Sequence, residues 1–238
     1  MPKLNILDWG LISYNEAQLQ QEEILKGIVD QKLLNRNAIQ SIQNKLPESY
    51  LIFCQHSPVY TLGNSGSKEN LLLDETELSE RGIEYYRIRR GGDITFHGPG
   101  QLVGYPILDL DQFFTDIHRY LRLLEETIIL TLDDLGIRAG RISGLTGVWV
   151  GFEEPESARK ICAIGVRCSR WVTMHGFALN ANTDLSYFEN IIPCGIKDKA
   201  VTSIEKELGQ KIDLPVVQQA VMKNFLHIFE LPQRLLLS

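Results

Sequence analysis

The stretch RRGGDITFHGPGQLVGYPI, residues 89–107, constrains the fold of this chain more than any other. Two glycine clusters surround a Thr-Phe-His core, and an apolar run follows them. Glycine removes the side chains that would keep a ligand away from the backbone, and Gly98-Pro99-Gly100 makes a tight turn. We therefore expect strands on both sides of the stretch and a group that approaches its main chain closely.

The rest of the chain predicts a single α+β domain. Apolar residues at helical spacing predict helices after the capping residues Ser13 and Asp74, from Ile117 to Leu135, and after Asp213. Strand-like runs are YLIFCQHSPVYTLG, EYYRI, LVGYPILDL, GVWVGF, KICAIGVRC and WVTMHGFALN. Their short spacing favours a mostly antiparallel sheet, in which Pro106 argues for an edge strand or a bulge. We expect one domain over residues 1–238, with residues 186–238 as its C-terminal annex.

Composition excludes several classes of protein. The chain has 238 residues with 44% hydrophobic side chains, enough for a buried core, and 24 basic against 30 acidic residues give a net charge of -6. The chain has no basic block long enough to indicate a nucleic-acid partner. The N-terminus lacks the pattern of a signal peptide, and no apolar run is long enough for a membrane span. We expect a cytoplasmic protein whose four cysteines stay as thiols, without disulfides or zinc.

The four cysteines fall into two kinds. Cys54, Cys162 and Cys168 lie inside apolar strand patterns, where cysteine packs as a small hydrophobic residue. Cys194 stands between a proline and a glycine in ENIIPCGIKDK, where neither a regular helix nor a central strand can continue. It is therefore a loop cysteine, either the end of a buried Ile-Ile segment or a reactive thiol.

Partners for a reactive thiol stand elsewhere in the sequence. Strand alternation places Lys160 on the same face as Cys162, Ile164, Val166 and Cys168, an apolar wall that would lower its pKa and let it share a thiol's proton. The alternative is a lysine at a strand end that reaches water. His97 and His175 each precede a glycine, and either a Cys-Lys pair or a Cys-His dyad fits these residues.

Neither of the common nucleotide-binding glycine patterns, G-x-x-x-x-G-K-[ST] and G-x-G-x-x-G, occurs in the glycine-rich stretch. The histidines have no carboxylate or cysteine at a ligand spacing, so no metal is expected. The remaining interpretation is a slot for a slim apolar chain that ends in a reactive carbonyl, with backbone N–H groups available for an oxyanion.

Five segments in this order carry a resemblance to a known family: RGGDITFHGPGQLVGYPILDL, GVWV, RKICAIGVR, MHGFALN and IIPCGI. The chain resembles the lipoyl(octanoyl) transferase family from about residue 50 to residue 206. The resemblance implies an α/β domain similar to the catalytic domain of biotin and lipoate ligases, with a mixed, largely antiparallel sheet and helices packed on it.

The resemblance also assigns roles to residues. Cys194 matches the family's acyl-thioester nucleophile, and Lys160 matches the lysine that lowers the thiol's pKa and handles its proton. The segments that match the family's substrate-binding positions are Arg90, Gly91, Gly92, Asp93, Ile94, Thr95, Phe96 and His97, then Ala163, Ile164 and Gly165, then Gly176, Phe177 and Ala178. Many of these residues are small, as a narrow tunnel requires. Cys162 departs from the family, which usually has a small residue without a thiol there.

The reaction that the resemblance implies moves an octanoyl group from octanoyl-acyl carrier protein to a specific lysine. Its acceptors are lipoyl domains of 2-oxoacid dehydrogenase E2 subunits and the glycine-cleavage H protein. A cysteine thioester is the intermediate, and neither ATP nor a cofactor is used. Two alternatives are an ATP-dependent lipoate or biotin ligase, which needs no cysteine, and a noncatalytic acyl-chain or carrier-binding module, which needs neither Cys194 nor Lys160.

An acidic chain that meets acidic carrier proteins requires a local basic patch. Arg87, Arg89 and Arg90 precede the glycine-rich stretch, and Lys197 and Lys199 follow the loop cysteine. The resemblance implies that the glycine-rich stretch and the cysteine meet at one pocket, and these two clusters would then rim its mouth. The alternative is that they are solvated loop charges.

Overall fold

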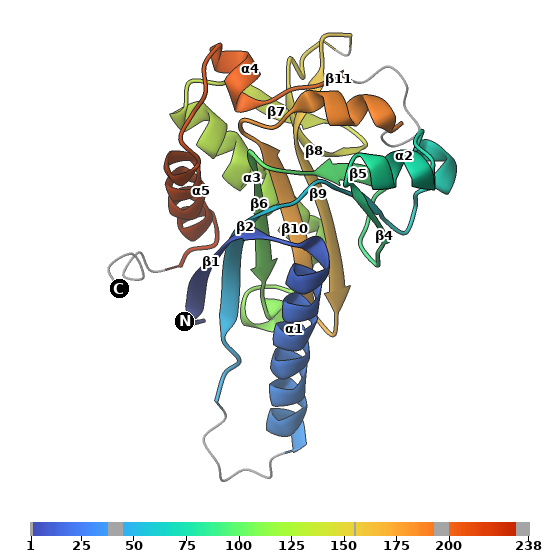
Figure 1. The fold of residues 1–238 in the computed structure, drawn as a ribbon. Coiled ribbons are helices and arrows are strands. Elements are labelled where there is room, and N and C mark those ends of the chain that lie inside the picture. The colour runs from blue at the N-terminus through green and yellow to red at the C-terminus, as the bar shows by residue number, and fades with distance from the viewer. Residues whose placement is uncertain (1, 38–44, 155, 193–199, 232–238) are drawn as a thin grey trace.

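The computed structural model describes residues 2–37, 45–154, 156–192 and 200–231. Within these ranges the larger of two sheets has eight strands, in the order β1-β2-β6-β10-β9-β8-β7, with β11 paired to β9 outside this path (Figure 1). Its strands are β1 (Leu4–Ile12), β2 (Ser49–His56), β6 (Gln101–Ile107), β7 (Ala139–Ile142), β8 (Leu145–Val150), β9 (Arg159–Ser169), β10 (Val172–Asn180) and β11 (Ala200–Val201).

Most neighbours in this sheet are antiparallel, and two pairs are parallel. β1 runs parallel to β2, and β11 runs parallel to β9. The ladders of β6 with β2 and β10, and those of β9 with β10 and β8, are antiparallel. The mixed, largely antiparallel sheet expected from the sequence is confirmed.

A smaller sheet in the order β4-β3-β5 lies beside the larger one. Its strands are β3 (Val59–Leu62), β4 (Glu84–Arg87) and β5 (Ile94–His97). β5 occupies the middle of the glycine-rich stretch, and β6 begins directly after the tight turn. The main-chain N–H of Gly91 donates to the carbonyl of Val166 in β9 at 2.9 Å, so the stretch joins the two sheets.

Helices cover both faces of the larger sheet. They are α1 (Tyr14–Asn37), α2 (Glu75–Glu80), α3 (Ile117–Asp134), α4 (Ile204–Leu208) and α5 (Leu214–Ile228), with short 3-10 turns η1 (Lys68–Asn70), η2 (Leu110–Gln112) and η3 (Leu185–Asn190). The predicted stripe of α3 is buried at Tyr120, Leu124, Ile128 and Leu132, where it packs with α5 and one face of the sheet. Helix α1 covers the opposite face, in front of the sheet in Figure 1.

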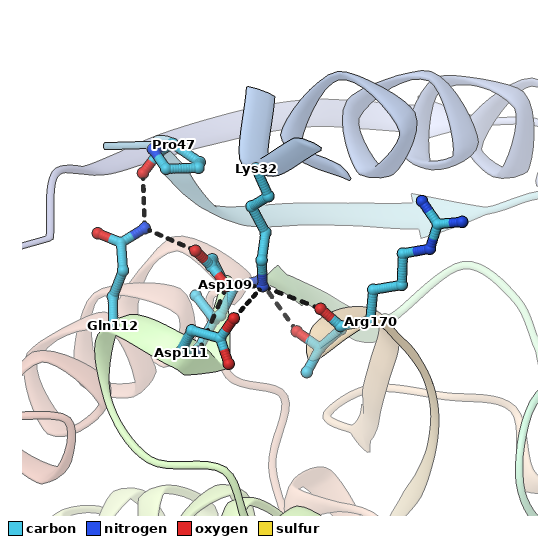
Figure 2. Close-up of polar contacts among 8 residues, drawn as sticks. Lys32, Pro47, Asp109, Asp111, Gln112 and Arg170 are labelled. Carbon is cyan, nitrogen blue, oxygen red and sulfur yellow. Dashed lines mark hydrogen bonds and ion pairs between the residues drawn. The ribbon is translucent and has the colours of Figure 1, made fainter. Parts of the chain in front are cut away.

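A buried ion pair fixes the C-terminal half of α1 to the sheet (Figure 2). The ammonium of Lys32 contacts the carboxylate of Asp109, lies 2.8 Å from Asp111, and donates to the carbonyl oxygen of Arg170 at 2.9 Å. The side chains of Lys32 and Asp109 are only 10% and 4% exposed. Through Lys32, helix α1 is therefore attached both to the segment that follows β6 and to the turn between β9 and β10.

The prediction that Pro106 marks an edge strand or a bulge was wrong. Strand β6 lies inside the sheet, between β2 and β10. The paired positions of β6 and β10 extend only to Gly104, opposite Phe177, whereas Pro106 is opposite Leu51 of β2. Proline, which has no N–H to donate, is tolerated here because the ladder with β10 is interrupted around Pro106 and resumes only at the bridge between Asp109 and Val172. Strands β1 and β7 were not predicted from the sequence at all.

Candidate active site

A cavity of about 210 Å³ lies between the smaller sheet and the middle of the larger one. Its wall is formed by residues from β5, β6, β9 and β10, together with Tyr14 at the start of α1 and Phe188 of η3. The predicted site residues in its lining are Lys160, Arg90, Gly92, Asp93, Ile94, Thr95, His97, Ala163, Ile164, Gly165, Gly176, Phe177 and Ala178. Apolar and small residues dominate this wall, which suits a slim apolar ligand.

Among the described residues of the predicted set, two do not line the cavity. The ring of Phe96 is stacked on Tyr187 at 4.3 Å between centroids and belongs to the small core under the second sheet. Gly91 is the residue whose N–H binds the main chain of β9. Both therefore lie outside the cavity lining.

Two glycines, which have no side chain, allow this wall to form. A Cβ on Gly165 would lie 2.7 Å from the carbonyl oxygen of Gly91, so any other residue in this position of β9 would push the glycine-rich stretch away. Gly92 has φ 89°, a conformation that side chains rarely adopt. The two glycines therefore let the stretch lie directly against β9.

Lys160 stands at one end of the cavity. The prediction that it shares a strand face with Cys162 was wrong. Val148 of β8 is opposite Cys162 and Trp149 is opposite Lys160, so one residue of β8 corresponds to two of β9. The extra residue, Ile161, forms a β-bulge that reverses the alternation. Cys162 is buried in the core under α3, whereas Lys160 lines the cavity with its ammonium 4.7 Å from the ring centre of Trp149.

Cys194, the predicted nucleophile, lies outside the described residues, as do Lys197 and Lys199. The chain that follows them is described from Ala200, where β11 pairs with the start of β9. Val201 is opposite Lys160 and also lines the cavity. The N–H of Thr202 donates to the carbonyl of Lys160 at 2.9 Å.

The other three cysteines have no activated thiol. Burial raises the pKa of both Cys54 and Cys162, and their prediction as packing residues is confirmed by their exposures of 2% and 0%. The pKa of Cys168 is also raised, chiefly by desolvation, although this side chain is exposed. The prediction that Cys168 packs in the sheet was therefore wrong, because the strand ends at the adjacent hairpin.

His97 lines the cavity with both ring nitrogens engaged. Its Nδ1 is 2.8 Å from Oε1 of Gln101, whose amide nitrogen donates to Phe96 and Asn180, so Gln101 accepts and Nδ1 carries the proton. Nε2 then accepts from the hydroxyl of Thr61 at 3.2 Å. Burial, followed by the nearby charge of Arg90, holds the pKa of His97 well below its ordinary value. The ring is neutral.

A second neutral histidine, His56, supports the same wall although sequence reasoning passed over it. Its Nδ1 donates to the carbonyl of Ile12 at 2.9 Å, and its Nε2 accepts from the hydroxyl of Tyr105 at 2.6 Å. Burial lowers its pKa to about 4. Tyr14 stacks on the ring of His97 at 5.9 Å. No local pattern distinguishes Tyr14 or Tyr105 in the sequence, because their partners come from distant strands.

Arg90 places a positive charge inside the wall. Its guanidinium donates to the carbonyl and hydroxyl of Thr61 at 2.7 and 2.9 Å and to the carbonyl of Gly91 at 3.0 Å. The residue is only 8% exposed, so the expectation that Arg90 rims the pocket mouth was wrong. Arg87 and Arg89 instead line a separate outer groove, together with Arg167 and residues of α1.

The described residues contain no group of three His, Cys, Asp or Glu side chains that could hold a metal ion. Among the described helices, none combines the length and the apolar character needed to cross a membrane.

The fold is that of the lipoate protein ligases. A solved archaeal lipoylation system from Thermoplasma acidophilum, a bipartite lipoate protein ligase and its E2 lipoyl domain, superimposes with a TM-score of 0.72 at 17% identity. The match covers 98% of this chain and 86% of that one. The predicted fold class is confirmed.

Sequence comparison defines the family. Residues 30–226 match the model of the lipoyl protein ligase A/B catalytic domain. An octanoyltransferase of Cytophaga hutchinsonii is 56% identical over 94% of this chain and 91% of its own length, and one of Flavobacterium johnsoniae is 56% identical over 96% and 97%. The chain belongs to the lipoyl protein ligase A/B catalytic domain family.

Proposed function

We propose that this chain transfers an octanoyl group from octanoyl-acyl carrier protein to a lysine of a lipoyl domain through a thioester on Cys194. That the chain is an acyltransferase acting in protein lipoylation follows from its octanoyltransferase relatives at 56% identity. The observation that supports the acyl route is the narrow, mainly apolar cavity with Lys160 at one end. The donor, the nucleophile and the acceptor proteins are part of the proposal.

In the first step, the thiolate of Cys194 attacks the carbonyl carbon of the carrier thioester. A new S–C bond forms, the S–C bond to the carrier breaks, and the carrier leaves as a thiol after taking a proton from the ammonium of Lys160. One thioester replaces another, so the step has little net free-energy change and needs no ATP. The cation of Lys160 also favours the thiolate over the thiol in the resting state.

In the second step, the neutral amine of the acceptor lysine attacks the octanoyl-cysteine. A C–N bond forms, the S–C bond to Cys194 breaks, and the proton of the attacking amine passes to Lys160. The products are an amide, the Cys194 thiolate and the Lys160 ammonium, which is the starting state. Because an amide is more stable than a thioester, this step draws the first one forward.

The arrangement of the described residues supports Lys160 as the proton carrier. Both ring nitrogens of His97 are engaged with Gln101 and Thr61, so this histidine would have to break a buried hydrogen bond before taking a proton. Lys160 lies beside Val201, where the described chain resumes a few residues after Cys194. A Cys-Lys pair therefore agrees better with the cavity than a Cys-His dyad.

The acceptors that we propose are the lipoyl domains of 2-oxoacid dehydrogenase E2 subunits and the glycine-cleavage H protein. The Thermoplasma acidophilum ligase is paired with an E2 lipoyl domain, which supports this class of acceptor. We also propose that the reaction takes place in the cytoplasm.

Intact-protein mass spectrometry after mixing with octanoyl carrier protein, without ATP, tests the proposal. We expect a mass increase of one octanoyl group that is absent in Cys194→Ser and retained in Cys168→Ser, a matched change at an exposed thiol. An adduct that forms only when ATP and free octanoate are supplied would favour the ligase. Reversible binding without any adduct or transfer would favour the noncatalytic module.

A further inference from the structure

His175 in β10 separates two hollows of the molecule. It lines the cavity described above and also the outer groove, whose other residues include Glu22, Arg89 and Arg167. The residue is 3% exposed. Its imidazole therefore stands between a mainly apolar cavity and a charged groove at the surface.

An unusual backbone conformation puts the ring in this position. Strict alternation along β10 would place His175 with Phe177 and Leu179 in the core under α3. His175 instead has φ 61°, which is uncommon for a residue with a side chain, and its ring lies on the cavity side. Its N–H donates to Oε1 of Gln21 in α1 at 3.0 Å, which stabilises this conformation from the neighbouring helix. Such strain persists where the surrounding structure holds it, and it points to a function.

The ring presents a neutral surface to the cavity. Desolvation, with the nearby charges of Arg90 and Arg167, lowers the pKa of His175 to about 3. Its buried Nδ1 has no hydrogen-bond partner among the described residues. A neutral ring with an unpaired nitrogen closes the apolar space without placing a charge there.

The distance along the strands matches an acyl chain of moderate length. Leu179 of β10 is opposite Cys162 near the Lys160 end of the cavity, and His175 lies four residues away. At about 3.3 Å per residue, this is roughly 13 Å of strand. An extended octanoyl chain, built from C–C bonds of about 1.5 Å, is roughly 9 Å long. Side chains at both ends shorten the available space, so a chain of eight carbons fills it.

We propose that His175 is the end wall of the acyl cavity and sets the length of the acyl chain that the protein accepts. The inference rests on the proposed function, since it requires the acyl chain to enter from the Lys160 end. A longer chain meets the imidazole, and beyond it the charged groove of Glu22, Arg89 and Arg167. Removing the ring joins the two hollows and admits longer chains.

The decisive variant is His175→Gly, because glycine adopts the positive φ of this position without strain. Acyl transfer to a lipoyl domain is measured with N-acetylcysteamine thioesters of six to fourteen carbons. For the parent we expect kcat/KM to fall steeply beyond eight carbons. For His175→Gly we expect the ratio of kcat/KM for twelve carbons to that for eight carbons to rise about tenfold or more, because added methylenes gain burial.

Arg167→Ala provides the matched control. It enlarges the outer groove but leaves the wall in place, so its chain-length profile should equal that of the parent. His175→Asn, which tolerates positive φ and is smaller than histidine, should give an intermediate profile and serves as the deciding variant if the glycine variant does not fold.

The outcomes separate the two hypotheses. A parent protein that transfers no acyl group of any length contradicts the proposed function. A parent that transfers octanoate, with His175→Gly and His175→Asn keeping its chain-length profile, overturns the end wall alone. A shift that also occurs in Arg167→Ala overturns it as well, because a general loosening of the fold would then explain the result.

Discussion

Two residues, Cys194 and Lys160, carry the proposed chemistry, and each can be tested alone. Replacing Cys194 by serine exchanges a thiol for a much weaker nucleophile while changing the volume little. We expect Cys194→Ser to form no stable octanoyl adduct and to lose on the order of 10³-fold or more in turnover. The adduct is followed by mass spectrometry, and turnover by octanoylation of a lipoyl domain. Turnover at the parent rate would refute the nucleophile.

Lys160→Met removes the ammonium beside Val201 and Trp149 but keeps the length of the side chain. A nearby cation favours the thiolate, so its loss should move the alkylation of Cys194 by iodoacetamide to higher pH and slow it at pH 7. Peptide mapping follows the alkylated thiols separately, and the exposed Cys168 serves as an internal control that should not change. An unaltered profile for Cys194 between pH 6 and 9 would argue against the Cys-Lys pair.

Single strands and helices position these residues. The bulge at Ile161 turns Lys160 into the cavity, and the positive φ of His175 turns its ring to the same side. Helix α1 contributes at both ends, since Tyr14 lines the cavity and Lys32 forms the buried ion pair. Loss of this ion pair should therefore lower the stability of α1 rather than displace Cys194 or Lys160.

The contribution of this ion pair can be measured with Lys32→Met. Removing one member of a buried pair leaves Asp109 as an uncompensated buried charge, and we expect the free energy of unfolding to fall by about 3–5 kcal/mol. Urea denaturation measures the change. Adding Asp109→Asn to the same chain should restore part of the loss, because the buried carboxylate is then gone.

Lys26→Met, on the same helix, is the control for this measurement. Lys26 pairs with Asp30 at the surface, so no measurable destabilisation is expected. A similar loss in both lysine variants would mean that helix propensity, rather than burial of charge, explains the effect.

At the scale of the whole molecule, the buried histidines make stability depend on pH. The folded-state pKa of His56, about 4, is lower than the usual value of about 6.5, so the unfolded chain binds the proton first as the pH falls. Stability is therefore lost as the pH drops below about 6.5. Between pH 7 and pH 5, this one residue should decrease the free energy of unfolding by about 2 kcal/mol.

The variant His56→Gln tests this dependence. It should be less stable than the parent at pH 7, because it loses buried hydrogen bonds, but its stability should fall by about 2 kcal/mol less between pH 7 and pH 5. Urea denaturation at both pH values gives the two differences. His118→Gln, at an exposed position of α3, should keep the full dependence of the parent. A parent whose stability is equal at both pH values would contradict the argument.

The sequence alone predicted the class of the fold and the segments that build the cavity. Periodicity identified α3 and its buried stripe, because amphipathic helices repeat their pattern within a few residues. The glycine-rich stretch indicated a close approach of backbone, which the contact between Gly91 and Val166 explains. These features are local, so they are visible in the order of the residues.

Tertiary structure decided what local order does not encode. One extra residue in β9 reversed the face of Lys160, and alternation cannot reveal a bulge that depends on pairing with β8. The interior place of Pro106 depended on the interruption of the ladder with β10 beyond Gly104. Arg90 became part of the wall because Thr61, on another strand, accepts its hydrogen bonds. Such positions are set by partners distant in the chain, and only the folded arrangement brings those partners together.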